Sequence, residues 1–272
     1  MTPLTWLYVP ADRPDRVAKA LASGAHAVIV DLEDAVAPAA KEAARAGLAG
    51  LFATRPPVRV FVRVNGIETQ WGEDDLRAAA ALPVHGVTLP KTEHARDTVA
   101  ALGLLGCKLA LHCLIESALG VEHAFEIASS PDVHGISLGE ADLRAQTGAG
   151  EAGLDWARSR VINASVAAGL GRPPQSVYPH VADLDGLAAS CAHGRELGFL
   201  GRTAIHPQQL PVIEAAYLPT EGEASAAREV VAAAAEHGPG GFAAGGRFID
   251  APIVAAAEQI VALAERYGTR GT

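Results

Sequence analysis

Short apolar runs alternate with helix-forming segments along most of this 272-residue chain. The run 58–64 is a clear example, since Val60-Phe-Val-Arg-Val is followed by the turn pair Asn65-Gly66. Such alternation is typical of parallel strands joined by helices. We count eight strand–helix units without a long polar linker, and therefore predict an α/β fold: a single (β/α)8 TIM barrel over residues 1–218.

The segments that make up this prediction follow one another without a change of composition. The predicted strands are 4–9, 26–32, 58–64, 86–89, 108–115, 133–139, 176–178 and 201–205. The predicted helices are 16–22, 38–53, 74–81, 93–105, the segment after Glu116, 154–168 and 184–197, the last capped by Asp183 or Asp185.

The tail, residues 219–272, is different. Helices predicted at 221–236 and 253–267 flank a Gly/Pro-rich stretch, 237–246, which cannot continue a helix. We expect a C-terminal helical extension that caps the barrel or reaches a neighbouring subunit. The chain is therefore expected to form a homo-oligomer.

Charge and cysteine content limit the classes of partner. A net charge of -9 argues against nucleic acid, which needs clustered Lys and Arg, although a phosphorylated ligand needs only a few local cations. The three cysteines (107, 113 and 191) give no disulfide framework. The N-terminus does not resemble a signal peptide, and no apolar run approaches the ~20 residues that span a membrane. We expect a cytoplasmic protein without a membrane partner.

Two successive predicted strands end on carboxylates, the first at Glu116 and the second just before Asp142. The carboxyl ends of barrel strands lie on one face, so these side chains are expected to converge. Two carboxylates without a thiolate or an imidazole pair suit a hard divalent cation, most simply Mg²⁺.

Arg63 lies within an apolar strand, where a charge is costly unless it is paired. A ligand carboxylate, Asp31 or Glu33 would provide that partner. Further polar residues follow other predicted strands, and each could equally be a solvated loop residue or an ion pair. These residues are Asp34, Lys91, Glu140 and His206.

One motif points to a different chemistry. Residues 135–139 fit the G-x-S-x-G pattern of a serine hydrolase, which needs its serine at a sharp strand-to-helix turn. Ser137 instead lies inside a strand, with no helix expected directly after it, so we interpret it as a serine that points into the barrel. The ten histidines show no zinc-binding spacing.

Several segments together resemble the HpcH/HpaI aldolase and citrate lyase β-subunit family, nearest to its citrate-lyase-β-like members and to malyl-CoA and citramalyl-CoA lyases. The resemblance covers nearly the whole chain in order. The segments are Leu7-Tyr-Val-Pro-Ala-Asp-Arg, Val28-Ile-Val-Asp-Leu-Glu-Asp-Ala-Val, Lys41-Glu-Ala-Ala-Arg45, Val62-Arg-Val-Asn65, Leu89-Pro-Lys91, Ile115-Glu116, Gly139-Glu-Ala-Asp-Leu143 and Ala204-Ile-His-Pro207.

The resemblance implies a TIM barrel, usually trimeric, that uses Mg²⁺ to make or break a carbon–carbon bond in a 3-hydroxyacyl thioester. By position, Glu116 and Asp142 match the metal ligands. Arg63 matches the arginine that holds the 2-oxo acid portion and stabilises the enolate. Those chemical needs agree with the residue types, because a metal and an arginine both stabilise developing negative charge.

The resemblance also implies supporting roles for other residues. Asp31, Glu33 and Asp34 match an acidic cluster that supports the metal-bound waters and the site arginine. Asp250 matches an aspartate of the tail that completes a neighbour's site as acid/base, although an Asp before Ala-Pro is also a good helix N-cap. Residues in segments that help to hold the coenzyme A phosphates are Lys19, Lys41 and Arg45.

The function expected is therefore a metal-dependent carbon–carbon lyase. Its substrate would be a 3-hydroxyacyl-CoA such as malyl-CoA or citramalyl-CoA, cleaved to acetyl-CoA and a 2-oxo acid. One alternative is the β subunit of a citrate lyase complex, which receives its acyl group from an acyl carrier protein. Another is aldol cleavage of free hydroxy-oxo acids without a thioester.

Overall fold

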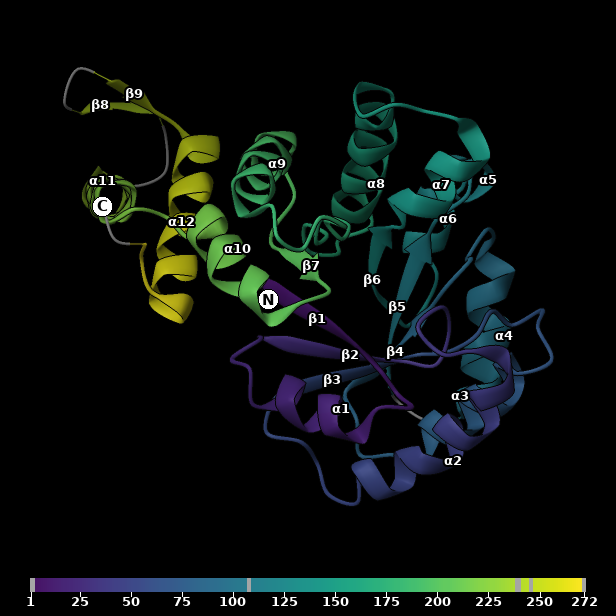
Figure 1. Cartoon of the computed structure of the whole chain (residues 1–272). Helices are drawn as coiled ribbons and strands as arrows, with labels where there is room; N and C mark the ends of the chain where they lie inside the picture. Colours follow the sequence, from purple (N-terminus) through teal and green to yellow (C-terminus); the bar gives the residue numbers. More distant parts are fainter. Residues whose placement is uncertain (1–2, 107–108, 238–240, 245–246, 271–272) are drawn as a thin grey trace. The chain divides into compact units, whose positions relative to one another are not determined.

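The computed structural model describes residues 3–106, 109–237, 241–244 and 247–270. The chain divides into two compact units, Met1–Ile213 and Glu214–Thr272, and each is described by itself (Figure 1). One of the three cysteines, Cys107, and the first residue of the strand predicted at 108–115 lie outside the described residues.

A curled parallel sheet forms the centre of the first unit, with helices on its outer side (Figure 1). Its order is β6-β5-β4-β3-β2-β1-β7, so strands that are successive in the sequence are neighbours from β1 to β6. The strands are β1 (Thr5–Pro10), β2 (Ala27–Asp31), β3 (Arg59–Arg63), β4 (Gly86–Leu89), β5 (Ala110–Ile115), β6 (Val133–Leu138) and β7 (Arg202–Ala204). The alternation read from the sequence is confirmed for these seven strands.

The strand predicted at 176–178 is absent, so that part of the prediction was wrong. The segment makes a single parallel bridge, between Gln175 and Arg202 of β7. Pro173 and Pro174 come directly before this bridge and have no N–H to donate to a ladder. The backbone hydrogen bonds with the β7 side are made by Pro173 and Gln175, whereas residues 176–178, which follow them, form no ladder.

Helices follow the strands, and all of those below except α7 and α10 lie in segments that the sequence predicted to be helical. They are α1 (Pro14–Leu21), α2 (Lys41–Leu51), α3 (Gly72–Ala80), α4 (Ala95–Leu105), α5 (Ala118–Glu122), α6 (Ala124–Ala128), α7 (Glu140–Thr147), α8 (Asp155–Ala167), α9 (Leu184–Leu197) and α10 (Leu210–Tyr217). Asp183 caps α9, as expected, since its carboxylate accepts the Gly186 N–H at 2.9 Å. Helix α7 was not expected so soon after β6. Its first turn carries two acidic residues, which the positive end of a helix favours.

The sheet is buried on both faces, as parallel sheets are. Aromatic side chains fill its inner side, where the Trp6 and Phe61 ring centroids lie 5.1 Å apart. His112 packs against both rings, and its Nε2 lies 3.1 Å from the Ser137 hydroxyl. Burial lowers the pKa of His112 to about 4, so the ring is neutral. Ser137 thus points to the inner side of the sheet, as predicted.

The second unit pairs two helices, α11 (Glu221–His237) and α12 (Ala251–Tyr267). Between them the strands β8 (Phe242–Ala244) and β9 (Arg247–Ile249) form an antiparallel hairpin that the sequence analysis did not predict. Within the Gly/Pro-rich stretch, the described residues 242–244 form β8 rather than a helix. Within the described ranges, no helix has the length and apolar character needed to cross a membrane.

Candidate active site

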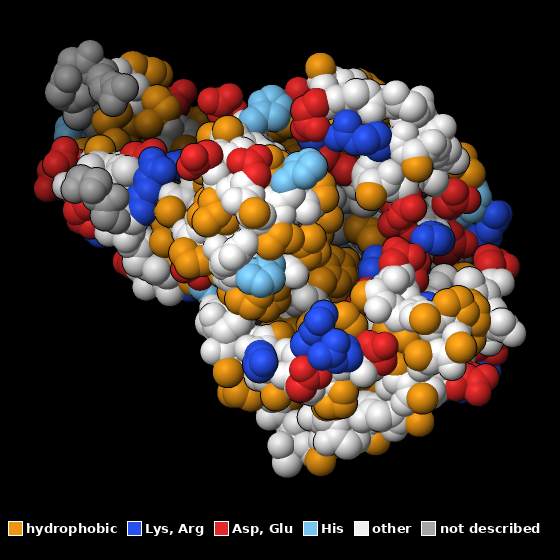
Figure 2. Space-filling model, viewed as in Figure 1, with side chains coloured by type: hydrophobic (Ala, Val, Ile, Leu, Met, Phe, Trp, Pro, Cys, Tyr) orange, Lys and Arg blue, Asp and Glu red, His pale blue; other side chains and the backbone are white. Residues whose placement is uncertain are grey.

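A cavity of about 360 Å³ opens at the carboxyl ends of the strands in the first unit. Apolar and aromatic side chains form much of its wall, and charged side chains of both signs gather beside the hollow in Figure 2. The charged residues that line it are Asp31, Asp34, Arg63, Glu116, Glu140 and Asp142. Among the strand-end residues that the sequence suggested, the structure therefore brings Asp34, Arg63, Glu116, Glu140 and Asp142 to one cavity, whose lining does not include His206.

Arg63, at the end of β3, is held by the acidic segment that follows β2. Its Nε and one Nη donate to the two Asp31 carboxylate oxygens, at 2.7 and 2.6 Å. Its other Nη lies 2.9 Å from Glu33 and 3.5 Å from Asp34. Burial disfavours the charge of Arg63, but the hydrogen bond with Asp31 and the negative charges of Asp31 and Glu33 together outweigh burial and raise the Arg63 pKa. The predicted pairing of Arg63 with this cluster is confirmed.

The acidic segment is itself ordered by backbone hydrogen bonds. The Asp31 carboxylate accepts the N–H groups of Glu33 (2.8 Å) and Ala35 (3.1 Å), which folds the chain back after β2. A ring face also borders the arginine, since Arg63 Cζ lies 4.8 Å from the centre of the Tyr8 ring. The guanidinium therefore has a fixed orientation.

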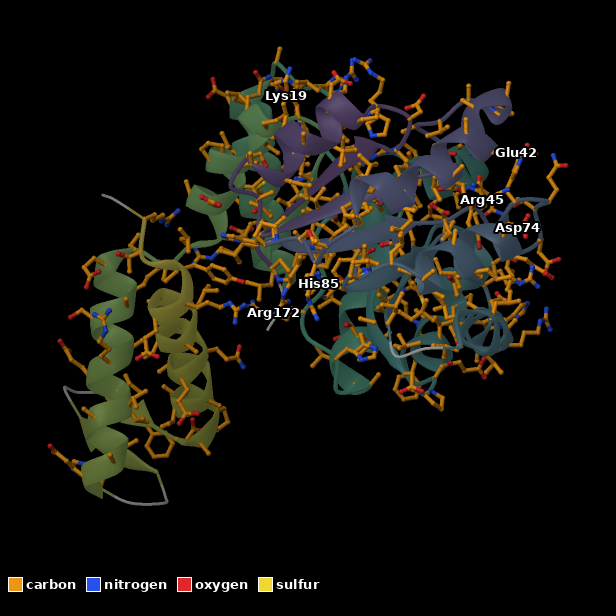
Figure 3. All side chains as sticks on the ribbon, turned by 90° about the horizontal axis from the view of Figure 1, so that it is seen from below. Lys19, Glu42, Arg45, Asp74, His85 and Arg172 are labelled. Carbon is orange, nitrogen blue, oxygen red and sulfur yellow. The ribbon has the colours of Figure 1, made fainter. Side chains whose placement is uncertain are left out.

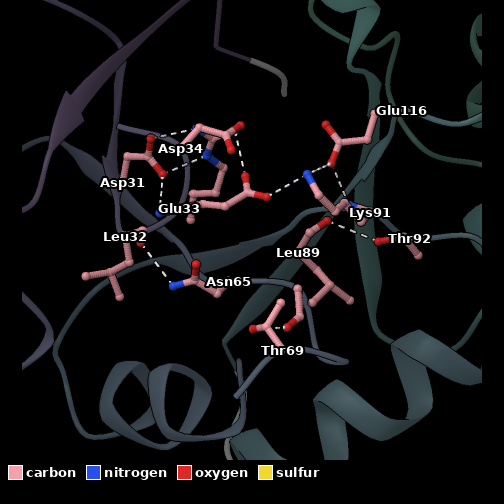
Figure 4. Close-up of polar contacts among 12 residues, drawn as sticks. Asp31, Leu32, Glu33, Asp34, Asn65, Thr69, Leu89, Lys91, Thr92 and Glu116 are labelled. Atoms are coloured by element: carbon pink, nitrogen blue, oxygen red, sulfur yellow. Dashed lines mark hydrogen bonds and ion pairs between the residues drawn. The ribbon is translucent and has the colours of Figure 1, made fainter. Parts of the chain in front are cut away.

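Lys91 links the acidic segment to Glu116, as Figure 4 shows. Its ammonium lies 2.9 Å from a Glu33 oxygen and 3.6 Å from Glu116 Oε1. Its backbone N–H donates to the same Glu116 oxygen at 2.7 Å. Burial raises the pKa of Glu33 above its ordinary value, although Arg63 and Lys91 oppose that shift.

Glu116 follows β5 and is almost completely buried. Burial, and then the neighbouring charge of Glu33, raise its pKa to about 8. Close packing against Gly139 explains why a glycine ends β6, because a Cβ there would lie 2.6 Å from Glu116 Oε2. The Glu116 carboxylate thus lies at the cavity wall, where an additional positive charge would stabilise its ionised form.

Asp142 lies on the exposed first turn of α7, and it lines the same cavity as Glu116. Its charge contributes to the raised pKa of Glu116. Glu140, two residues earlier, is instead bound by Arg158 through both of its oxygens, at 2.9 and 2.6 Å. Glu140 is therefore committed to Arg158, whereas Asp142 is exposed at the cavity that Glu116 also lines.

The residues present fit a hard divalent cation. Both candidate ligands are carboxylates, and burial, followed by the charges of Glu33 and Asp142, raises the Glu116 pKa, a shift that a bound cation would oppose. In the part of the chain that the structure describes, no three His, Cys, Asp or Glu side chains form a complete metal cage. Two carboxylates with water and substrate filling the other positions is a common arrangement for Mg²⁺.

The expected role of Lys41 in phosphate binding was wrong. Its ammonium is buried and donates to Leu32 O (2.9 Å), Glu33 O (2.6 Å) and Asn65 Oδ1 (2.7 Å). All three N–H donors are thereby used inside the protein. Lys41 instead stabilises the backbone of the acidic segment after β2.

Arg45 and Lys19 lie on separate parts of the surface in Figure 3. Arg45 is ion-paired with Asp75 at 3.1 Å and lies 3.6 Å from Asp74, while Lys19 is exposed on α1. A shallow groove is lined by residues next to the start of α1 and by small residues of α2 such as Ala43 and Gly47. The two cations do not form one preassembled site, so their predicted role in binding coenzyme A stays a prediction.

Asp250 and His206 both act as helix caps. The Asp250 carboxylate accepts the Ile253 N–H at 3.3 Å and caps α12 in the second unit. His206 Nδ1 accepts the Gln208 N–H at 3.2 Å after β7. The cap reading of Asp250 is confirmed, and its role as acid/base stays a prediction.

Three contributions to the site were not assigned by sequence reasoning. They are the ring of Tyr8 beside Arg63, the double contact of Lys91 with Glu116, and the capture of Glu140 by Arg158. Tyr8 and Lys91 fall in the quoted motifs Leu7-Tyr-Val-Pro and Leu89-Pro-Lys, which was the available signal. The third contact left no signal in the sequence, because the partners are separated by a loop.

Comparison with known proteins extends this picture. Residues 4–207 match the family HpcH/HpaI aldolase/citrate lyase, and residues 157–269 match a family of C–C bond lyases of the TIM-barrel fold. The chain is 34% identical to a (3S)-malyl-CoA thioesterase of Cereibacter sphaeroides, over 95% of this chain and 93% of that protein. It is 32% identical to the citrate lyase subunit beta of Escherichia coli, over 97% and 94%.

A solved structure is similar over the same length. The CitE protein of Mycobacterium tuberculosis, in complex with magnesium, acetoacetate and coenzyme A, aligns with a TM-score of 0.82. The two sequences are 33% identical, and the alignment covers 97% of this chain and 98% of CitE.

The curled parallel sheet, with an anchored arginine and two available carboxylates at its carboxyl end, defines an enzyme of the carbon–carbon lyase class. The chain belongs to the HpcH/HpaI aldolase/citrate lyase family.

Proposed function

We propose that this enzyme cleaves or forms a carbon–carbon bond in a 3-hydroxyacyl-CoA thioester, such as malyl-CoA or citramalyl-CoA, and that it depends on Mg²⁺. The products of cleavage would be acetyl-CoA and a 2-oxo acid. The observation that carries the proposal is the convergence of Glu116, Asp142 and the doubly anchored Arg63 on one cavity. The magnesium and coenzyme A bound by the similar CitE protein support it.

Glu116 and Asp142 would hold the cation, which supplies a Lewis acid for the carbonyl and carboxylate of the 2-oxo acid. Arg63 would bind the same portion of the substrate from the other side. Because Asp31 fixes the guanidinium through two hydrogen bonds, Arg63 meets developing negative charge without first reorienting. The apolar wall of the cavity strengthens that interaction by limiting water.

In the cleavage direction the 3-hydroxyl group would give its proton to the carboxylate of Asp250, and the bond between C2 and C3 breaks. The electron pair of that bond forms the enolate of the acetyl thioester, which then takes a proton at its α-carbon. We assign that proton transfer to Asp250, which would come from a neighbouring chain. Lys19 and Arg45 would hold the coenzyme A phosphates.

The proposal includes the architecture that this chemistry uses. Residues 1–218 would form a (β/α)8-type barrel in which the bridge between Gln175 and Arg202 takes the place of an eighth strand. Residues 219–272 would form the extension that joins the subunits of a homotrimer. The molar mass of the assembly in solution tests the subunit number, and a monomer would contradict it.

A second candidate is the β subunit of a citrate lyase complex, which acts on a citryl group carried by an acyl carrier protein. It is favoured by the similarity to the Escherichia coli subunit over 94% of that protein's length. The malyl-CoA thioesterase relative also makes hydrolysis of the thioester an outcome to monitor.

The test is a panel of 3-hydroxyacyl-CoA thioesters, assayed on the purified full chain with Mg²⁺ or with a chelator. Acetyl-CoA, free coenzyme A and the 2-oxo acid are measured separately. We expect matched release of acetyl-CoA and 2-oxo acid, lost with the chelator. Release of free coenzyme A without 2-oxo acid would show that the enzyme hydrolyses the thioester and would contradict the lyase activity. Turnover of only a carrier-bound citryl group would favour the second candidate.

Glu116→Gln provides the residue-level test, because it removes a charge from the site with little change of shape. We expect kcat/KM to fall on the order of 10²–10³-fold. Glu126→Gln, an exposed residue of α6, is the matched control and should retain the activity. Equal activity of Glu116→Gln and the control, or activity that ignores the chelator, would overturn the metal-dependent function.

A further inference from the structure

Lys91 has an unusual backbone conformation. Its φ is 52°, in the left-handed region that side chains other than glycine rarely adopt. Among the described non-glycine residues only Asp132 shares this feature, with φ 59°. A strained residue beside a cavity suggests that the conformation serves the site.

The left-handed turn directs two donors of Lys91 toward one carboxylate. Its N–H donates to Glu116 Oε1 at 2.7 Å, and its ammonium lies 3.6 Å from that same oxygen (Figure 4). The ammonium is also 2.9 Å from Glu33 Oε1. Lys91 is therefore the positive charge that balances Glu116 in this structure, on the side of the carboxylate that faces Glu33.

Neighbouring contacts hold this turn in place. The N–H of Thr92 donates to Leu114 O at 3.2 Å, and the Thr92 hydroxyl donates to Leu89 O at 3.1 Å. The end of β4 is thereby tied to β5 just before Glu116. The side chain of Lys91 is half exposed, so its ammonium has room to move while its backbone stays fixed.

We propose that Lys91 is a positioning residue that holds Glu116 Oε1 through its N–H and whose ammonium takes the place of the divalent cation until that cation binds. The proposal rests on the metal-dependent function above and extends it. When the cation binds, the ammonium withdraws from Glu116 and remains with Glu33 or meets a carboxylate of the substrate. The cation and the ammonium thus compete for one carboxylate.

The competition has a measurable consequence. Two like charges around one carboxylate repel each other strongly in a partly buried site, so removing the ammonium should tighten metal binding on the order of tenfold. A side chain that only stabilised the fold would leave the affinity unchanged or weaken it when removed. The direction of the change therefore separates the two roles.

The experiment measures binding of Mn²⁺, as a spectroscopic probe of the Mg²⁺ site, to the full chain without substrate. Lys91→Met removes the charge and keeps the backbone strain. Lys91→Gly removes the charge and the strain together, and keeps the N–H. Asp132→Gly is the matched control, because it relieves the other strained turn at an exposed position away from the site.

We expect Lys91→Met and Lys91→Gly to bind Mn²⁺ more tightly than the wild type, and Asp132→Gly to bind it equally. Unchanged or weaker binding in either folded Lys91 variant would overturn the proposal. If the wild type binds no divalent ion, the metal-dependent function itself is contradicted. If the wild type binds the ion and the Lys91 variants bind it equally, only the proposal for Lys91 is contradicted.

Discussion

Two arginines in the first unit are each surrounded by three carboxylates, yet they lie in different settings. Arg63 contacts Asp31, Glu33 and Asp34, and it lines the candidate catalytic cavity. Arg158 contacts Glu140 of α7, Glu151 of the turn before α8, and Asp155 of α8. In both cases a hydrogen-bonded carboxylate raises the arginine pKa against the effect of burial.

The difference lies in where the carboxylates come from and where the guanidinium points. Asp31 and Glu33 are neighbours in one segment at a strand end, so Arg63 joins adjacent strands at the mouth of the sheet. Arg158 is only 2% exposed and joins α7, the turn before α8, and α8 itself. Its capture of Glu140 also leaves Asp142 as the available carboxylate of α7. Similar sets of charges thus line the candidate ligand site in one place and tie helices together in the other.

Replacing each arginine by lysine tests this comparison most strongly. Lysine keeps the charge but loses the planar fork that binds Asp31. We expect Arg63→Lys to lower kcat/KM about 10³-fold, and Arg158→Lys to lower it less than about tenfold. Steady-state kinetics with Mg²⁺ and the thioester measure both effects, and circular dichroism checks the fold. Losses of equal size in the two variants would mean that the clusters do not differ in role.

Stability should respond in the opposite order. Arg158→Met leaves the buried Glu140 without its partner, so we expect the free energy of unfolding to fall by about 3 kcal/mol. Arg160→Met, on the same helix with only an exposed bond to Glu122 O, should change it by less than about 0.5 kcal/mol. Urea unfolding of both variants measures the difference. Equal stability of the two would remove the structural role from Arg158.

The same two clusters show which contacts could be predicted from the sequence and which could not. The pairing of Arg63 with Asp31 was predictable, because a charge inside an apolar strand needs a partner and parallel strands place their ends together. The tie between Arg158 and Glu140 was not, since nothing in the sequence of α8 distinguishes a buried arginine from an exposed one. Lys41 was misassigned for the same reason: a helix of mixed charges does not reveal which cation turns inward.

Backbone details were also beyond the sequence. Seven strands followed from alternation, but the residues expected as a strand at 176–178 form no ladder, and the bridge to β7 is made by Gln175 just before them. The left-handed turn at Lys91 has no sequence signature, because it depends on contacts made by neighbouring strands. The sequence therefore located the candidate site at the strand ends, while the geometry within it required the fold.

The smallest predicted effect is a change with pH in the free energy of unfolding that the Arg158 cluster contributes. Hydrogen bonds lower the pKa of two of its members below their ordinary values of 4.5 and 3.8. For Glu151, burial acts in the opposite direction but the bonds from Arg144 and Arg158 outweigh it; for Asp155, the bond with His193 contributes most. As the pH falls, the unfolded chain takes up protons first. The stability from these contacts is therefore present above about pH 4.5 and is lost below it.

The measured quantity is the difference in unfolding free energy between the wild type and Arg158→Met, at about pH 6 and about pH 3.5. We expect it to shrink in acid by less than about 1 kcal/mol, because the Glu151 side chain is 65% exposed and solvent screens the pair. The difference for Arg160→Met should stay constant, which controls for the general effect of acid on the fold. A difference that grows in acid would contradict the lowered pKa values, and the cluster would then owe its stability to packing rather than to charge.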